Sequence, residues 1–247
     1  MGKLVVIGDI HGRAVWRKIV DDNPDADKFI FLGDYFDSHE NKYYPSRQVF
    51  NFKQILQLQE ELGKDRVILL LGNHDYHYFN NSEKYSGYNQ TTYFDANPLL
   101  KENYRNGNVK IFHVEDDILF SHAGFSEYWL KNVSSSNTLE EINNNELFDY
   151  RTLKWNMDCG CDEYGDTKSN SPIWIRPNSL RDYKLNGYIQ VVGHTWFWED
   201  AIDELKSIGE NEGVYLADCL PHHYLIIDNK EFKYIKIEYE TQNEGIR

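Results

Sequence analysis

Carboxylate and imidazole side chains recur in this sequence at the ends of short apolar runs, close to glycines. The first example is Asp9 and His11, which follow the apolar run 4–7 and stand between Gly8 and Gly12. A carboxylate and an imidazole two residues apart, on a turn that the glycines permit, can bind one metal ion together. One such pair proves little, because an Asp at the end of a strand more often forms a turn or caps a helix.

The same arrangement returns after later apolar runs, so coincidence becomes a poor explanation. Each of these runs leads into Asp, Asn or His with a glycine nearby. The residues are Asp34 and Asp37 after 28–32, Asn73, His74 and Asp75 after 67–71, His122 after 117–120, and His194 after 189–192. Oxygen and imidazole ligands in such a set suit borderline divalent ions such as Mn²⁺, Fe²⁺ or Zn²⁺. No structural role requires that set, so the sequence favours a metal centre.

The elements that must position these side chains are parallel strands joined by helices. Four consecutive apolar residues at 4–7 suit a strand that is buried on both faces. Helices are expected at 13–22 and 46–62, between the first three apolar runs. Such β-α-β-α-β connections place the carboxyl ends of the strands side by side, where an open α/β sheet leaves room for a ligand. Side chains from Asp9 to Asp75 can therefore converge on one site.

The longer helix, 46–62, is expected to bury one face and to end at Gly63. The side chains predicted on the buried face are Phe50, Ile55, Leu58 and Leu62. Beyond the third apolar run, stretches rich in Asn, Tyr and Ser at about 76–108 and 126–175 predict loops and short helices. We expect these two inserts to form a lid or specificity region.

The remaining apolar runs predict further strands. The runs 109–114 and 117–120 predict a hairpin, and 189–192 predicts a strand that leads into His194. Three late runs, 214–217, 224–227 and 232–239, predict antiparallel strands that finish the chain. Because the sequence contains neither an internal repeat nor a linker, we expect a single domain over residues 1–247.

Composition and charge narrow the function classes. The chain has 247 residues and a formal charge of −14, which argues against a broad surface for nucleic acid or an anionic membrane. No apolar run approaches the length that spans a bilayer, and no signal-peptide pattern precedes the first strand, so we expect a cytoplasmic protein. The cysteines Cys159, Cys161 and Cys219 are an odd number in a long chain and are expected to be reduced, structural thiols.

Taken together, the motifs resemble those of the calcineurin-like metallophosphoesterases, whose signature is GD-x-HG, GD-x-x-D, GNH-D/E and later histidines. In this chain they are Gly8-Asp9-Ile10-His11-Gly12, Gly33-Asp34-Tyr35-Phe36-Asp37, Gly72-Asn73-His74-Asp75, His122 in Ser-His-Ala-Gly and His194 in Gly-His-Thr. The resemblance implies an α/β fold, a four-layered α/β/β/α sandwich with two mixed sheets. Thr195 and Trp196 stand where many members have a second histidine, which is similar to the phosphoprotein phosphatase branch.

The resemblance also implies a centre of two divalent metal ions. Its ligands would be Asp9 and His11 on one ion, Asn73, His122 and His194 on the other, and Asp34 as the bridge between them. Mn²⁺ is the expected metal, with Fe, Zn and Ni as alternatives. Two carboxylates against two divalent ions leave a local charge of about +2, which matches a phosphate dianion in an otherwise acidic protein.

Further roles follow from the same resemblance. His74 would protonate or stabilise the leaving alkoxide, and Asp75 would accept its other N–H and set its orientation. Arg176 would contact the phosphate, because a guanidinium binds two oxygens at once. Ser38 stands where the branch usually has another phosphate-binding arginine, and Asp37 is expected to support a ligand.

These inferences predict hydrolysis of phosphomonoesters, foremost phosphoserine and phosphothreonine, by a hydroxide that bridges the two metals. Because Ser38 replaces an arginine, hydrolysis of nucleotides or of dinucleoside polyphosphates such as diadenosine tetraphosphate stays open, and a phosphodiesterase is a further alternative. A non-catalytic binding module is least favoured, because the ligand set is intact. The expected partner is a phosphorylated substrate, and neither a membrane nor an extended nucleic acid is expected.

The other histidines and the tyrosine-rich stretch are assigned structural roles. Without a motif partner, a histidine is more often a surface or packing residue than a ligand. This applies to His39, His77, His113, His222 and His223. The tyrosines within 76–93 are expected to pack the lid rather than to stack on a nucleobase.

Overall fold

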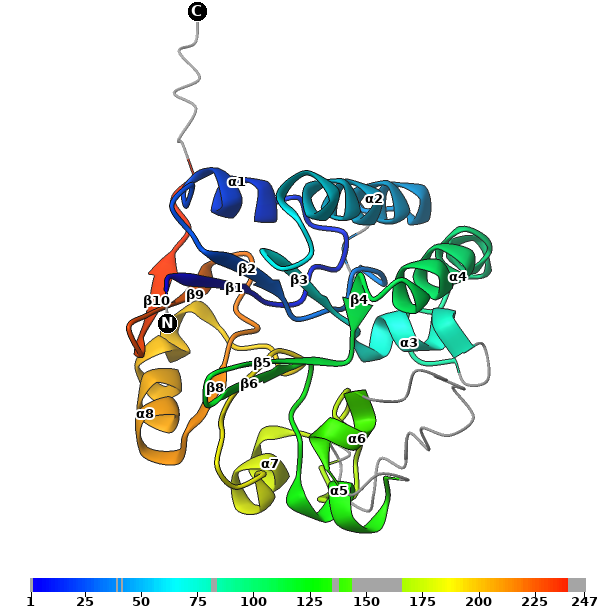
Figure 1. Cartoon of the computed structure of the whole chain (residues 1–247). Coiled ribbons are helices and arrows are strands. Elements are labelled where there is room, and N and C mark those ends of the chain that lie inside the picture. The colour runs from blue at the N-terminus through cyan, green and yellow to red at the C-terminus, as the bar shows by residue number, and fades with distance from the viewer. Residues whose placement is uncertain are drawn as a thin grey trace, which may run out of the picture.

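The computed structural model describes residues 2–38, 40, 42–80, 84–134, 138–143 and 166–239. Two mixed β-sheets lie face to face with helices on their outer faces, so the fold is a four-layered α/β/β/α sandwich (Figure 1). The six-stranded sheet has the order β10-β9-β1-β2-β3-β4, and the four-stranded sheet has the order β5-β6-β7-β8. The predicted fold class is confirmed.

Short strands and mostly short helices make up both halves of the sandwich. The strands are β1 (Leu4–Ile7), β2 (Lys28–Phe31), β3 (Val67–Leu70), β4 (Val109–Lys110), β5 (Phe112–Glu115), β6 (Ile118–Ser121), β7 (Ile189–Val192), β8 (Val214–Leu216), β9 (His223–Asp228) and β10 (Glu231–Lys236). The helices are α1 (Trp16–Asp21), α2 (Pro45–Leu62), α3 (Asn73–Asn80), α4 (Gln90–Arg105), α5 (Glu127–Asn132), α6 (Leu139–Asn143), α7 (Pro177–Tyr183), α8 (Ile202–Glu212) and a 3₁₀ turn at Glu199–Ala201. Within the described ranges, none of the helices has the length and apolar character needed to cross a membrane.

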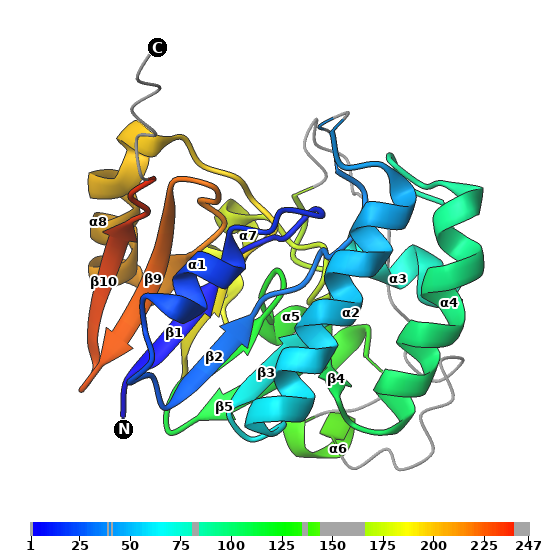
Figure 2. The same cartoon turned by 90° about the horizontal axis from the view of Figure 1, so that it is seen from above.

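The first three strands form the parallel part of the larger sheet, as their apolar runs predicted. β1 pairs in parallel with β2, and β2 pairs in parallel with β3. Figure 2 shows α1 and α2 lying over these strands. Val5 and Ile7 belong to the core cluster beneath these helices, whereas Leu4 and Val6 belong to the cluster between the sheets. This burial on both faces explains why residues 4–7 are all apolar.

Helix α2 buries a face that is rotated from the predicted one. Val49, Phe52 and Ile55 are buried, whereas Phe50 is 60% exposed. Since each residue advances about 100° around a helix, Phe50 points away from the face that Phe52 and Ile55 share. The inward prediction for Phe50 was therefore wrong. Leu58 and Leu62 are half-buried at the edge of the core, and Gly63 ends the helix as predicted.

The insert 76–108 contains a long helix where loops and short helices were predicted. Helix α4 has 16 residues and begins after Asn89, whose side chain accepts a hydrogen bond from the Thr91 N–H. Ala96 and Leu100 are buried in the same core cluster as α2. Pro98 and the polar composition of the segment hide this helix in the sequence.

Two strand predictions also need correction. The run 109–114 does not form one arm of a hairpin, because β4 pairs with β3 in the larger sheet and only β5 pairs with β6 in the smaller one. The run 214–217 contains β8, which is parallel to β7 rather than antiparallel. A strand that follows a helical crossover returns in the parallel direction, and α8 provides that crossover. β9 and β10 are antiparallel, as predicted.

Part of the second insert and some of the singled-out residues lie outside the described residues. These are the stretches 135–137 and 144–165, the latter with Cys159 and Cys161, and the histidine at position 39. Cys219 is a buried free thiol, in agreement with the expectation for that residue.

Candidate metal centre

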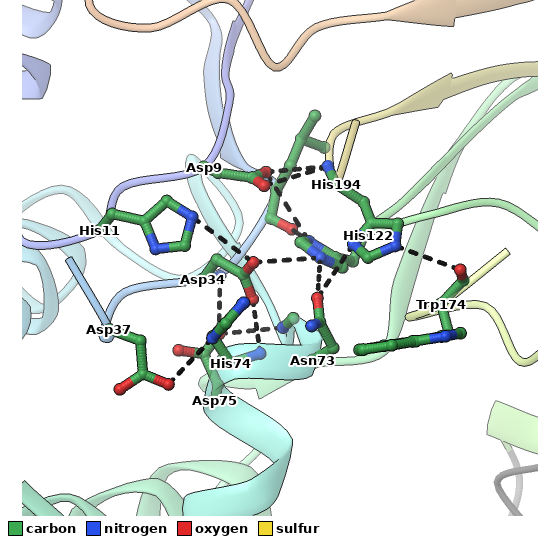
Figure 3. Close-up of polar contacts among 12 residues, drawn as sticks. Asp9, His11, Asp34, Asp37, Asn73, His74, Asp75, His122, Trp174 and His194 are labelled. Atoms are coloured by element: carbon green, nitrogen blue, oxygen red, sulfur yellow. Dashed lines mark hydrogen bonds and ion pairs between the residues drawn. The ribbon is translucent and has the colours of Figure 1, made fainter. Parts of the chain in front are cut away.

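The predicted ligands meet where the parallel strands of the two sheets end (Figure 3). Asp9, Asp34 and Asn73 follow β1, β2 and β3 of the larger sheet, and His122 and His194 follow β6 and β7 of the smaller one. All five side chains are buried. The site is therefore assembled from both sheets, as the strand-end pattern predicted.

Asp34 lies between two groups of candidate ligands. Its Oδ2 atom is 3.8 Å from His11 Nε2 on one side and 3.4 Å from His122 Nε2 on the other. Asp9, His11 and Asp34 form one group with ligand atoms within 4.8 Å of one another, and Asp34, His122 and His194 form a second. One carboxylate shared by two groups is the arrangement that a bridge between two ions requires.

The three imidazoles are fixed by backbone carbonyls behind them. A ligating histidine commonly donates its outer N–H to a carbonyl or carboxylate, which leaves the other nitrogen with a lone pair for a metal. The contacts are His11 Nδ1 with the Phe36 carbonyl at 2.8 Å, His122 Nδ1 with the Leu32 carbonyl at 2.8 Å and His194 Nε2 with the Trp174 carbonyl at 3.1 Å. The inner nitrogens of His122 and His194 converge on Asn73 Oδ1, at 2.9 and 3.0 Å. These donor atoms fit divalent cations.

The electrostatics of the site also call for positive charge. Burial raises the pKa of both Asp9 and Asp34 well above the ordinary value, and each is raised further by a neighbouring carboxylate. Burial also lowers the pKa of His122 to about 3 and that of His194 well below its usual range, so both rings are neutral. Neutral imidazoles beside buried carboxylates with raised pKa values form a set that divalent ions would stabilise.

The backbone is strained at several of these residues. His11, Asp34, Asp37 and His194 have φ angles of 42°, 51°, 59° and 63°, in the left-handed region that residues with a Cβ seldom adopt. The backbone at Gly72 also passes very close to the Asp34 side chain, because a Cβ at Gly72 would lie 2.1 Å from Asp34 Oδ1. Such outliers cluster at functional sites, where the surrounding fold holds them in place.

His74 lies beside this group, but its partner differs from the predicted one. Its Nδ1 atom is 2.9 Å from Asp37 Oδ2, and its backbone N–H donates to Asp34 Oδ1 at 2.8 Å (Figure 3). The expected contact with Asp75 is thus replaced by a contact with Asp37. The reason is the direction of the side chains at the start of α3, where His74 turns toward the loop after β2 and Asp75 turns back toward the strand ends.

The Asp75 carboxylate instead braces three backbone amides. It accepts hydrogen bonds from the N–H groups of Asp34 at 2.8 Å, Tyr35 at 2.8 Å and Gly72 at 2.9 Å. Burial raises its pKa to about 7, although these hydrogen bonds act in the opposite direction. Asp75 therefore joins the end of β2 to the start of α3 instead of orienting His74.

Arg176 lies at the edge of the same site. Its Nη1 atom donates to the His194 carbonyl and to Thr195 Oγ1, both at 3.1 Å. Burial lowers the pKa of the guanidinium, while the carboxylates of Asp9 and Asp34 favour its charged form. A phosphate contact from this position stays a prediction.

Three residues near the site were missed or undervalued in the sequence. Asp218 is buried, and burial raises its pKa to about 6. It follows the apolar run 214–217, so the strand-end rule could have found it. Arg13 follows the first motif directly and donates to the Asp9 carbonyl at 3.4 Å, with Glu40 at 3.1 Å on its other side. His77, which was expected to be a packing residue, contacts Asp37. Its position three residues after His74 was the signal that the sequence offered.

Comparisons with known proteins agree with this geometry. The family model described as calcineurin-like phosphoesterase matches residues 2–206. A metallophosphoesterase from Sphaerobacter thermophilus is similar in structure, with a TM-score of 0.50, 14% identity, and coverage of 96% of this chain and 89% of that one. A protein serine/threonine phosphatase from Saccharomyces cerevisiae is similar with a TM-score of 0.52 and 14% identity, covering 98% of this chain and 82% of the other. At such identities these structures show a shared fold. No curated protein matches the chain.

Proposed function

The chain belongs to the calcineurin-like phosphoesterase family, and we propose that it hydrolyses phosphomonoesters, foremost phosphoserine and phosphothreonine side chains, at a centre of two divalent ions. The family makes the protein a metal-dependent phosphoesterase. The observation that supports a dinuclear centre is the position of Asp34 between two ligand groups. The expected metal is Mn²⁺, since the set mixes carboxylate, amide and imidazole donors.

The proposed ligands divide between the two ions. Asp9 and His11 would hold one ion, Asn73, His122 and His194 would hold the other, and Asp34 would contact both. When bound, two such ions neutralise the charge on phosphate and lower the pKa of a water molecule enough for it to attack phosphorus near neutral pH. The carboxylates keep the charge excess near a single phosphate dianion, which favours a terminal phosphate group as the substrate.

His74 is the proposed general acid. Its Nδ1–H donates to Asp37, which leaves Nε2 as the atom that would deliver a proton to the leaving oxygen. The ionised Asp37 stabilises the protonated ring before that transfer. A serine alkoxide is a poor leaving group, so this proton is most important for phosphoserine and phosphothreonine.

Arg176 is the proposed phosphate-orienting residue. One of its terminal nitrogens is occupied by the His194 carbonyl and Thr195, which fixes the plane of the guanidinium. A guanidinium fixed in this way can offer its remaining N–H groups to a nonbridging phosphate oxygen.

Nucleotide or dinucleoside polyphosphate hydrolysis is the second candidate. It is favoured by Ser38, which replaces an arginine of the protein phosphatase branch and whose hydroxyl accepts the Glu40 N–H at 3.1 Å. An enzyme with fewer cationic contacts to a single phosphate would depend more on binding the rest of its substrate. A phosphodiesterase activity would follow from the same reasoning.

A substrate profile tests the proposal. Purified protein loaded with Mn²⁺ would be assayed on a phosphoserine peptide, diadenosine tetraphosphate, a cyclic nucleotide and para-nitrophenyl phosphate, and its metal content measured. We expect two ions per chain and the highest kcat/KM on the phosphopeptide. Dominant turnover of the dinucleotide would support the second candidate, and failure to bind metal would leave the binding-module alternative.

A further inference from the structure

The Asp37 carboxylate contacts two histidines of helix α3 at once. Its Oδ2 atom is 2.9 Å from His74 Nδ1 and 2.7 Å from His77 Nε2. Its other oxygen accepts a hydrogen bond from the Tyr78 hydroxyl at 2.5 Å. His77 and Asp37 are almost fully buried, at 1% and 3% exposure. Every oxygen of this carboxylate is thus held by a side chain of one helix.

The proton of the His77 ring can be assigned from its second contact. The backbone N–H of Tyr85 donates to His77 Nδ1 at 3.2 Å, so Nδ1 carries a lone pair. A neutral ring then carries its proton on Nε2, the atom that faces Asp37. That N–H is not aligned on the oxygen, so the contact is a close polar one rather than a straight hydrogen bond. An unprotonated Nε2 at the same distance would repel the carboxylate.

Asp37 is ionised in spite of its burial. Burial by itself raises the pKa of this carboxyl group, but the contacts with His74 and then His77 outweigh that effect and hold the pKa below its ordinary value. A buried carboxylate is held most firmly when each of its oxygens has a donor. Removal of His77 would take away the second polar contact of Oδ2 and the ring packed beside it, so that His74 and Tyr78 alone would hold the carboxylate.

Residues 84–89 of the insert close over this cluster. The Tyr85 ring is stacked on the His77 ring, with centroids 5.7 Å apart and an interplanar angle of 11°. A Cβ at Gly87 would lie 2.8 Å from Asp37 Cβ, so the backbone passes directly over Asp37. The Asn89 N–H donates to the Tyr78 hydroxyl at 2.9 Å. The insert therefore contacts all three members of the cluster: His77, Asp37 and Tyr78.

A third metal ion is the alternative occupant of the cluster. Asp37, His74 and His77 offer ligand atoms within 4.8 Å of one another. A metal at His77 Nε2 would require the ring proton to move to Nδ1, where it would face the Tyr85 N–H. The tautomer that the backbone imposes therefore disfavours a metal here.

We propose that His77 is a positioning residue which, together with residues 84–89, holds Asp37 so that His74 presents Nε2 to the leaving group. This inference rests on the proposed acid role of His74. In this proposal, residues 84–89 help to position a catalytic group, which is a different role from the selection of substrates.

The test uses two substitutions at one position. His77→Phe keeps a ring for Tyr85 to stack on but removes both nitrogens, whereas His77→Gln places an amide N–H near the former Nε2. We expect His77→Phe to lower kcat on a phosphoserine peptide by about tenfold to a hundredfold, with KM and metal content unchanged. The loss should be several times smaller on para-nitrophenyl phosphate, whose leaving group needs less protonation, and His77→Gln should restore most of the rate.

Two further variants separate positioning from general damage. Gly87→Ala should show the same dependence on the leaving group, and His77→Phe should add little to the loss caused by His74→Asn. The matched control is His113→Phe, because His113 is also partly buried beside a carboxylate, Glu115, and stacks on Phe120. Equal losses on both substrates, additivity with His74→Asn, or the loss of one bound ion in His77→Phe would overturn the proposal.

An NMR measurement keeps this test independent of the proposed function. In wild type loaded with diamagnetic Zn²⁺ we expect a hydrogen-bonded Nδ1 proton on His74, which should weaken or exchange faster in His77→Phe and persist in His77→Gln. An unchanged signal in His77→Phe would overturn the role of His77. If wild type hydrolyses no phosphoester, the proposed function fails, and the ring-proton signals still decide the role of His77.

Discussion

Asp34 and His122 face each other from different sheets, with 3.4 Å between Asp34 Oδ2 and His122 Nε2. Asp34 follows β2 of the six-stranded sheet, and His122 follows β6 of the four-stranded one. A metal ion bound by both residues would therefore link the two sheets. The stability of the sandwich and the occupancy of the site should depend on each other.

Metal binding should accordingly raise thermal stability. Ligand that binds only the folded state at a hundred times its Kd adds about 2.7 kcal/mol to the free energy of unfolding. For a domain of this size that corresponds to a rise in Tm of about 5–10 °C. Differential scanning fluorimetry of protein dialysed against EDTA and then titrated with Mn²⁺ measures it. Titrations with Mg²⁺ and Ca²⁺ serve as controls. A Tm that does not change with Mn²⁺ would contradict the link between the sheets.

Asp34→Asn should separate stability from activity. The amide can still accept the His74 N–H through its oxygen, but it removes a buried negative charge that burial already disfavours. We expect the metal-free variant to be at least as stable as the metal-free wild type, to lose the stabilisation by Mn²⁺, and to lose activity by about a hundredfold or more. Urea unfolding with and without Mn²⁺ gives both stabilities, and a variant that keeps two ions would remove Asp34 from the bridging role.

The pH dependence of the metal-free protein should have a definite sign. Burial raises the pKa of Asp75 to about 7, so the folded state holds that proton more tightly than the unfolded state does. Such a group favours folding at low pH and loses its contribution as the pH rises through the folded value. His122 has its pKa lowered to about 3 and His194 has its pKa lowered as well, so below about pH 7 each binds a proton only in the unfolded state and adds a slope of the opposite sign. Asp9, Asp34 and Asp218 also have raised pKa values, so the buried carboxyl groups outnumber these two histidines, and we expect the free energy of unfolding to fall between about pH 5 and 7.

Urea unfolding in EDTA at three pH values across that window checks this prediction. In saturating Mn²⁺ the fall should be smaller, because cations favour the ionised carboxylates. A stability that rises with pH in the absence of metal would show that these carboxyl groups do not control the slope.

His74→Asn should lower kcat far more than metal content. Asn can keep a hydrogen bond to Asp37 through its amide but cannot supply a proton to a leaving alkoxide. We expect a loss of about a hundredfold to ten-thousandfold on a phosphoserine peptide and a smaller loss on para-nitrophenyl phosphate. Steady-state kinetics with elemental analysis of the same samples separates the two effects. Parallel loss of ions and rate would remove His74 from the acid role.

Arg176→Lys should weaken phosphate binding while it preserves charge. Lysine lacks the planar fork with which Arg176, donating to the His194 carbonyl, would bind a phosphate oxygen at the same time. We expect the inhibition constant for inorganic phosphate and KM to rise by about tenfold, with a small change in Tm. Inhibition by phosphate that is the same in Arg176→Lys and wild type would show that Arg176 does not reach the anion.

Strand ends were the most predictable part of this molecule. The rule that parallel strands bring their carboxyl ends together predicted that Asp9, Asp34, Asn73, His122 and His194 would meet, and they do. Their roles as ligands stay predictions. The same rule applied to 214–217 would have added Asp218. The prediction succeeded because the residue that follows a parallel strand lies at the carboxyl edge of the sheet whatever the side chains around it are.

Features that depend on side-chain direction could not be predicted in this way. The motif Asn73-His74-Asp75 places a carboxylate next to His74 in sequence, yet consecutive helical residues point in different directions, so Asp37 became the partner. His77 lies one helical turn after His74, but its proposed role depends on contacts with Asp37 and with residues 84–89. No local sequence pattern connects these three parts of the chain. Helix α4 was missed because its apolar stripe is interrupted by Asn and Pro98.

The left-handed backbone at His11 and His194 has a consequence for the history of such chains. A sequence designed only to suit this backbone would place glycine at both positions, and would avoid a cost of about 1 kcal/mol at each. The proposed role of His11 and His194 as metal ligands would explain why imidazole side chains stand at these two positions. In related chains that have lost catalytic activity, glycine could replace both residues without loss of function. Glycine at both positions 11 and 194 would therefore identify inactive proteins with the same fold.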